Sequence, residues 1–207
     1  MQGSKKFKIH LKGLSPLIMH SDRLCNPLDP KAKQLKEISS IRGKKDEHYL
    51  AMAELEWFGA LYYDEEIGLM IPSKVILGCF QAAARKFKLG KSTKGLMVDC
   101  SIGIPLKGFE GKTDKQLWDI KNKAGERQHV FSNTVVVGMA RLVRTLPIFQ
   151  KWELEFEVYL NTELLSEKQL RTIIETAGFE FGFGELRPQN ANGTFGRFFL
   201  ESLEEVK

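Results

Sequence analysis

Glycine and arginine are concentrated in two short segments near the end of the chain, 182–187 and 193–197. Together the two segments contain four glycines and two arginines: Gly182, Gly184, Gly193, Gly196, Arg187 and Arg197. Glycine lets backbone N–H groups approach a ligand closely and adopts positive φ without steric cost. Arginine presents a planar fork of donors that matches phosphate oxygens. These residues predict a loop that holds a polyanion, although a tight helix-to-strand turn with two surface arginines has the same composition.

The order of elements around these glycines excludes a dinucleotide-binding fingerprint. That fingerprint requires a strand before the glycines and a helix after them. Here an amphipathic helix precedes the glycines and a strand follows them, and Arg187 stands where the third glycine would fall. The chain also lacks the complete phosphate loop of nucleoside triphosphatases.

Further positive charge lies in two helical regions that are remote from the glycines in sequence. One contains Lys86, Lys88 and Lys91, and the other contains Lys31, Lys33, Arg42 and Lys44. If all these regions converge, the first extends a track of phosphate contacts and the second forms its outer wall. Any one region alone is typical of a solvated face. The chain carries 31 Lys and Arg against 26 Asp and Glu, a net charge of +5, which permits a polyanionic partner without requiring one.

Two aromatic side chains, Phe183 and Phe195, are available to line such a groove. Base stacking on an aromatic ring contributes about 1–3 kcal/mol per base. Both residues could equally belong to the core, which is the commoner place for phenylalanine.

Histidine and cysteine spacing argues against a metal site, and no cofactor is expected. The four histidines are His10, His20, His48 and His129, and the three cysteines are Cys25, Cys79 and Cys100. None of them forms a pair at metal-ligand spacing, and an odd number of widely separated cysteines does not predict a disulfide framework. His20 is the candidate general base for metal-independent RNA cleavage, with Lys36 or Arg42 stabilising the phosphorane charge. A surface histidine is the simpler interpretation, so we favour a protein without catalytic activity.

Hydrophobic periodicity predicts an α+β protein whose core has the ferredoxin-like order β-α-β-β-α-β, as in RNA-recognition folds. The expected core elements are a strand at 6–12, a helix N-capped by Ser73, a strand at 96–105, a hairpin of Thr134–Arg144 with Trp152–Leu160, a helix opened by the capping box at Ser166 and C-capped by Gly178, and a strand at 194–202. We expect a single domain, 1–207, with a mostly helical insertion at 20–70 and a loop insertion at 106–132.

In this arrangement the first and third strands are neighbours in the centre of the sheet. Lysines and His10 alternate along the first strand, and glutamates alternate along the third. Opposite charges on neighbouring strands contribute about 0.2–1 kcal/mol per pair. The solvent face of the sheet is therefore expected to be self-neutralised, and it lacks the paired aromatics with which RNA-recognition sheets stack bases.

The sequence resembles the RAMP superfamily of CRISPR-associated proteins, above all the RNA-coating backbone subunits of multisubunit effectors. The segment 71–78, Ile-Pro-Ser-Lys-Val-Ile-Leu-Gly, is similar to that family's helix entry, and 182–197 is similar to its C-terminal glycine-rich loop. Leu77 replaces a residue that is often basic in the family, Glu185 adds a negative charge to the loop, and the 20–70 insertion has no counterpart. The chain is also similar to small proteins encoded in phage genomes. The resemblance implies single-stranded nucleic-acid binding and side-by-side self-assembly.

Three functions of different class follow. The first is a non-catalytic protein that binds single-stranded RNA rather than DNA, as a homo-oligomer or as a subunit of a larger nucleoprotein. The second is a metal-independent endoribonuclease that uses His20. The third is a phage-encoded protein-interaction or inhibitor module. The chain has no apolar segment approaching the length of a membrane span, so we expect no membrane partner and a cytoplasmic location, bacterial or in a phage host.

Overall fold

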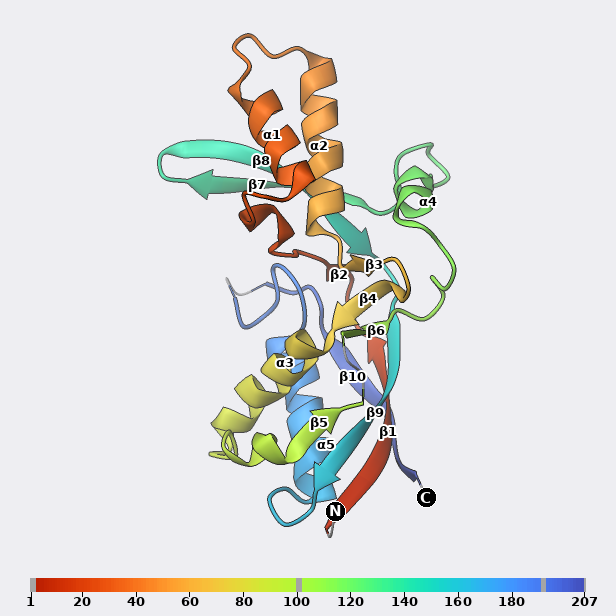
Figure 1. The fold of residues 1–207 in the computed structure, drawn as a ribbon. Coiled ribbons are helices and arrows are strands. Elements are labelled where there is room, and N and C mark those ends of the chain that lie inside the picture. Colours follow the sequence, from red (N-terminus) through yellow and green to blue (C-terminus); the bar gives the residue numbers. More distant parts are fainter. Residues whose placement is uncertain (1–2, 100–101, 191–192, 207) are drawn as a thin grey trace. The chain divides into compact units, whose positions relative to one another are not determined.

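The computed structural model describes residues 3–99, 102–190 and 193–206 (Figure 1). Cys100 lies outside the described residues. The chain is divided into two compact units, the first formed by 1–17, 63–112 and 149–207 and the second by 18–62 and 113–148. The described residues contain five α-helices together with antiparallel strands, so the fold is α+β. The second unit contains most of both predicted insertions and extends beyond them to residue 148.

The first unit is built on a four-stranded antiparallel sheet. In spatial order its strands are β10 (Phe198–Val206), β1 (Ser4–Gly13), β9 (Glu153–Asn161) and β5 (Leu96–Val98). Along the chain, helix α3 (Ser73–Lys86) precedes β5, and α5 (Glu167–Thr176) connects β9 to β10. The two helices pack against each other beside this sheet (Figure 1).

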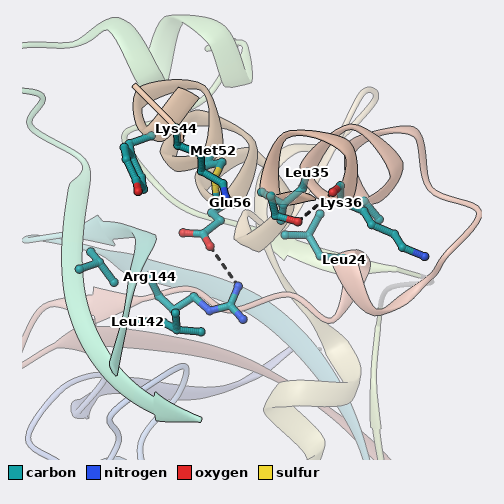
Figure 2. A pocket seen from close by; sticks show the side chains of 12 residues that line it. Leu24, Leu35, Lys36, Lys44, Met52, Glu56, Leu142 and Arg144 are labelled. Carbon is teal, nitrogen blue, oxygen red and sulfur yellow. Dashed lines mark hydrogen bonds and ion pairs between the residues drawn. The ribbon is translucent and has the colours of Figure 1, made fainter. Parts of the chain in front are cut away.

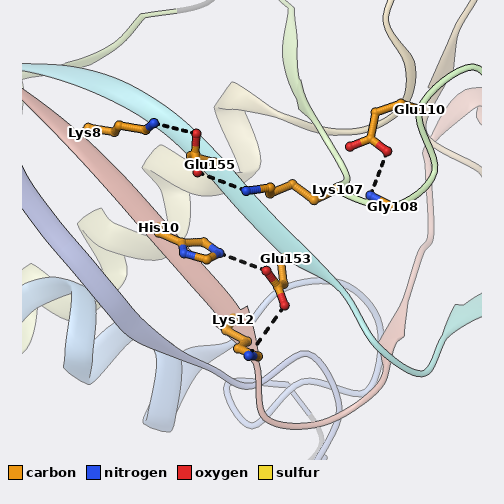
Figure 3. Close-up of polar contacts among 8 residues, drawn as sticks. All are labelled: Lys8, His10, Lys12, Lys107, Gly108, Glu110, Glu153 and Glu155. Carbon is orange, nitrogen blue, oxygen red and sulfur yellow. Dashed lines mark hydrogen bonds and ion pairs between the residues drawn. The ribbon is translucent and has the colours of Figure 1, made fainter.

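Strand β1 alternates between the core and the solvent, as its sequence predicts. Phe7, Ile9 and Leu11 are fully buried. The intervening side chains form a charge ladder with β9 (Figure 3), in which Lys8 Nζ lies 2.7 Å from Glu155 and His10 Nε2 lies 3.0 Å from Glu153. Each partner is displaced by two residues from the directly opposite position, since Lys8 pairs in register with Glu157. The prediction of a self-neutralised sheet face is confirmed.

Helix α5 begins and packs as the sequence predicts, but it ends differently. The Ser166 hydroxyl accepts a hydrogen bond from the Gln169 N–H, and the Gln169 side chain accepts one from the Ser166 N–H, which confirms the capping box. The prediction of Gly178 as its C-cap is wrong, because the chain continues through a π-helical turn, η3 (Ala177–Phe181). That turn ends at Gly182, which has a φ of 70°.

Helix α3 begins one residue earlier than predicted. Pro72 occupies the N-cap and Ser73 is the first helical residue, with its hydroxyl donating to the carbonyl of Ile102 over 3.3 Å. This contact joins the helix to a small sheet. The strands of that sheet, in spatial order, are β3 (Tyr63–Asp64), β4 (Gly68–Pro72) and β6 (Gly103–Pro105).

Two predicted strand arrangements are wrong. The segment 96–105 is not one strand, because β5 pairs with β9 whereas β6 pairs with β4. The predicted hairpin between Thr134–Arg144 and Trp152–Leu160 does not form. Instead β7 (Val130–Val137) turns at Gly138 and pairs with β8 (Ala140–Phe149), and β9 pairs with β1, which is remote in sequence.

The second unit combines this β7–β8 pair with helices. Its other elements are the end of β2 (Leu17–Ile18), which pairs with β8, a helical turn η1 (Arg23–Cys25), α1 (Pro30–Ser40), α2 (Asp46–Ala60) and α4 (Asp114–Asp119). Trp57 anchors its core, because the fully buried indole donates to the His129 carbonyl over 2.7 Å and packs against Trp118. Glu56, also buried, accepts hydrogen bonds from Arg144 and from the Thr145 N–H.

The charge ladder predicts a dependence of stability on pH at Glu155. Hydrogen bonds from Lys8 and then from Lys107 lower the pKa of Glu155 from 4.5 to about 2. Because the folded state favours the charged form, this stabilisation is present above pH 4.5 and is lost as the pH falls toward 2. The difference in urea unfolding free energy between wild type and Glu155→Gln should therefore be larger at pH 7 than at pH 3.

The matched control is Glu201→Gln, which changes an exposed glutamate of β10 outside the ladder. A Glu155→Gln effect that is equal at both pH values would contradict the assigned ion pairs.

Candidate nucleic-acid interface

The glycine-rich loop is folded onto its own unit through backbone hydrogen bonds. Phe183 N–H donates to Gly196 O over 2.9 Å, and Gly196 N–H donates to Pro16 O over 2.8 Å. The N–H groups of Gly182 and Gly193 donate to carbonyls of Ala177 and Asn190, respectively. These three glycine N–H groups are therefore bonded within the protein, whereas the sequence predicts that they face a phosphate.

Close backbone packing explains why glycine is required at several of these positions. A Cβ atom at Gly193 would overlap the Leu186 carbonyl, and one at Gly196 would overlap the Phe183 carbonyl. Gly196 also has a φ of 68°, which favours glycine. A Cβ atom at Gly178, in the turn that precedes this loop, would likewise overlap the Phe198 carbonyl oxygen. The fold alone thus accounts for these glycines, as the alternative interpretation of the sequence has it.

The two arginines differ in how they are held. Arg187 donates to Gly184 O over 2.7 Å, so its guanidinium closes the loop on itself. The guanidinium carbon of Arg197 lies 5.0 Å from the centre of the Phe179 ring, a cation–π contact. Among the described residues, Arg197 Nε is the buried side-chain nitrogen or oxygen that has no hydrogen-bond partner.

Helix α3 makes one polar contact with this loop and another with the η3 turn that precedes it. The buried thiol of Cys79 donates to Gly182 O over 3.3 Å, and burial raises the pKa of that thiol to about 12, so it is neutral at physiological pH. Lys86 Nζ lies 2.6 Å from Glu180 on η3. Arg197 contacts Phe179 and Lys86 contacts Glu180, and because these two partners are consecutive, both cations lie at the same turn. The charge of Lys86 is balanced there by Glu180.

The other predicted lysines at the end of α3 are on the surface. Lys88 and Lys91 are exposed, and Lys88 adopts a φ of 61°, a rare conformation for a non-glycine residue. They lead into a helical turn, η2 (Ser92–Gly95), which contains the exposed Lys94. Positive charge therefore continues along the chain from the end of α3 to η2.

A hollow of about 270 Å³ lies between α3 and η2. It is lined by Lys74, Leu77, Gly78 and Gln81 from α3, and by Thr93, Lys94 and Leu96 from η2 and the start of β5. The resemblance draws attention to the entry of α3, but sequence reasoning assigned no ligand contact to Gly78 or Lys94. The sequence feature that could have pointed to this hollow is a glycine inside a predicted helix.

Gly78 differs from the glycines of the loop, because apart from its chain neighbours and the backbone of its own helix no described protein atom lies within 4 Å of the position of a Cβ. Its φ is also outside the left-handed region. Glycine in a helix interior costs about 0.5–1 kcal/mol relative to alanine. Neither packing nor backbone conformation within the described residues calls for glycine here, and the position faces an open hollow.

The basic residues predicted as an outer wall belong to the second unit. Lys33 and Arg42 are exposed, Lys44 donates to the Ile41 carbonyl over 2.8 Å, and the Lys31 ammonium lies over the Phe58 ring. Their role as a wall for the same ligand stays a prediction.

Three further candidates have different outcomes. Phe183 is buried and stacks on Phe198 with ring centres 4.5 Å apart, so it is a core residue and does not line a groove. Phe195 is partly exposed. His20 is exposed, and its backbone carbonyl accepts a hydrogen bond from the Tyr62 hydroxyl. Neither observation tests the catalytic role of His20, which stays a prediction.

The described residues contain no cluster of three or more side chains suited to a metal ion. Within the same part of the chain, every helix is too short or too polar to cross a bilayer. Comparison of the sequence with protein-family models and with curated proteins gives no match.

The glycine loop yields a stability prediction. Gly196→Ala combines a left-handed φ with a clash against Phe183 O, whereas Gly108→Ala has a φ of 85° but open space around the Cβ. The strain of a left-handed residue costs about 1–2 kcal/mol, and overpacking adds about 1–3 kcal/mol. Chemical denaturation should show that Gly196→Ala is the more destabilising. Equal losses for the two variants would contradict the packing explanation.

Proposed function

We propose that the protein binds single-stranded nucleic acid, RNA rather than DNA, without catalysing a reaction on it. The observation that carries this proposal is the hollow beside Gly78. Two lysines, the Gln81 amide and the Thr93 hydroxyl line it together with this glycine, which has no side chain to fill the space. A strand that contacts the helix backbone at Gly78 would explain a glycine that the fold itself does not require.

The fold of the first unit supports the proposal. As part of this proposal we interpret its sheet order, β10-β1-β9-β5, with α3 before β5 and α5 before β10, as the β-α-β-β-α-β order of a ferredoxin-like core. We assign this core to the RAMP type on the helix entry at 71–78 and the glycine-rich loop. Side-by-side assembly along the strand is part of this proposal.

Electrostatics favours the α3 side over the open sheet face as the place for a polyanion. On the sheet, Lys6, Lys8 and Lys12 each pair with glutamates of β9. At the hollow, the exposed ammonium group of Lys94 contributes positive charge, and Lys88 and Lys91 precede it along the chain. The phosphate track of the proposal therefore runs through Lys88, Lys91 and Lys94 rather than through Lys86, which Glu180 neutralises.

The chemistry of the hollow favours RNA. Gln81 and Thr93 line it. The Gln81 amide can donate and accept hydrogen bonds, and the Thr93 hydroxyl, which donates to Gly90 O over 2.7 Å, can accept one. A ribose 2′-hydroxyl also donates and accepts, and this group distinguishes RNA from DNA at a given site. In this arrangement Arg187 holds the loop in shape, and Arg197 is the arginine assigned to a phosphate.

The first test of the proposal is a salt series with single-stranded RNA and with DNA of the same sequence. Counterion release predicts that the logarithm of affinity falls linearly with the logarithm of salt, by about 0.7 per phosphate neutralised on a single strand. We expect a negative slope and tighter binding of RNA in fluorescence anisotropy. An affinity that does not change with salt would contradict the proposal.

A second test separates ligand contact from folding at Gly78. Because a Cβ there meets no protein atom, Gly78→Ala should raise stability by about 0.5–1 kcal/mol, as expected for helix propensity. Gly78→Gln, which fills the hollow, should weaken RNA binding, and Lys94→Ala should do the same and reduce the salt slope.

The matched control is Lys168→Ala, which removes an exposed lysine of α5 that does not line the hollow. If Lys168→Ala and Lys94→Ala weaken binding equally, the hollow is not the binding site.

A further inference from the structure

The second unit contains a larger hollow of about 530 Å³ (Figure 2). Side chains from η1, α1, α2 and β8 form its walls, all within the second unit. Its volume lies in the range of small-molecule sites, about 300–1,000 Å³. Lys44 is the one residue of the predicted basic set that lines it.

The walls of this hollow are largely apolar and open to solvent. Leu35 and Met52 line it from the two helices, and Leu142 and Val143 line it from β8. Tyr49 is 57% exposed and Val143 is 64% exposed, so a large apolar surface remains in contact with water. Such a concave surface with an aromatic ring at its wall can enclose a flat, mainly apolar group.

Cationic side chains outnumber carboxylates among the residues that line the hollow, with Lys36, Lys44 and Arg144 against Glu56. The carboxylate of Glu56 is already satisfied, because one oxygen accepts from Arg144 over 3.0 Å and the other from the Thr145 N–H over 2.9 Å. Figure 2 shows the Glu56 carboxylate and the Arg144 guanidinium directed toward each other. A guanidinium has five N–H donors, and this ion pair uses one of them. With the Lys44 ammonium, the hollow offers positive charge and donors beside apolar walls.

We propose that this hollow binds one nucleotide of the strand, with the base between Tyr49 and the apolar wall at Val143, and the phosphate on the Lys44 ammonium and on the N–H groups of Arg144 that Glu56 does not use. Aromatic rings and guanidinium planes are the surfaces on which proteins stack unpaired bases. The excess of positive charge favours an anion, and the apolar walls beside the Tyr49 ring favour a flat apolar group. A nucleotide combines the two. This inference rests on the proposed function and adds a base-binding position to it.

Two valine substitutions on the same hairpin provide the test. Val143→Glu places a negative charge inside the hollow, whereas Val136→Glu makes the same change at a position that is 67% exposed and does not line it. Both positions are on the surface, so the two variants should keep the circular dichroism and the thermal midpoint of wild type.

The probe is adenosine 5′-monophosphate, with adenosine and inorganic phosphate as separate arms, followed by NMR at millimolar concentration. Wild type and Val136→Glu should bind the nucleotide more tightly than either fragment, and Val143→Glu should bind it about tenfold or more weakly, as expected for the loss of one stacked and charge-paired base. No binding of the nucleotide by wild type, or equal binding by the two variants, would overturn the inference. Equal affinity for an acidic peptide and for the nucleotide would also overturn it.

Single-stranded RNA binding by the same proteins distinguishes the two proposals. RNA binding that is retained by wild type and by both variants leaves the proposed function standing and overturns the base position. Loss of RNA affinity in Val143→Glu alone supports both. Failure of wild type to bind RNA overturns the proposed function, and with it the assignment of this hollow to a strand.

Discussion

The first unit depends on strand β1, because both faces of this strand are occupied by contacts with the rest of the unit. Its inner face buries Phe7, Ile9 and Leu11, and its outer face pairs its lysine side chains with the glutamates of β9. Burial of the apolar face fixes the register, since a slip of one residue would move these side chains to the solvent. The same register neutralises the open face, and for this reason our proposal assigns polyanion binding to the side of the helices.

The glycines of this protein fall into two groups with different physical causes. Gly193 and Gly196 are required because backbone carbonyls occupy the space of a side chain. Gly78 has no such neighbour and lines a hollow, and our proposal attributes this glycine to a ligand that approaches from outside. The composition of the loop attracted the functional interpretation first, but the isolated helix glycine supports it more strongly.

Features encoded by neighbouring residues could be predicted from the sequence, and features that depend on distant partners could not. The alternation of β1 and the capping box at Ser166 follow from local spacing. The partner of β9 is β1, far away in the chain, and a nearest-neighbour hairpin was therefore the wrong choice. In the site, charge placed Lys88 and Lys91 on the surface correctly, whereas the pairing of Lys86 with Glu180 and the burial of Phe183 depend on tertiary contacts.

Amide hydrogen exchange with and without single-stranded RNA tests the central claim most directly, because it locates the contact without any substitution. The account predicts slower exchange around the hollow, in 74–81 of α3 and 92–96 of η2 and β5, with unchanged exchange in β1 and β9. Protection along the sheet strands with none around the hollow, under conditions in which RNA is bound, would contradict it.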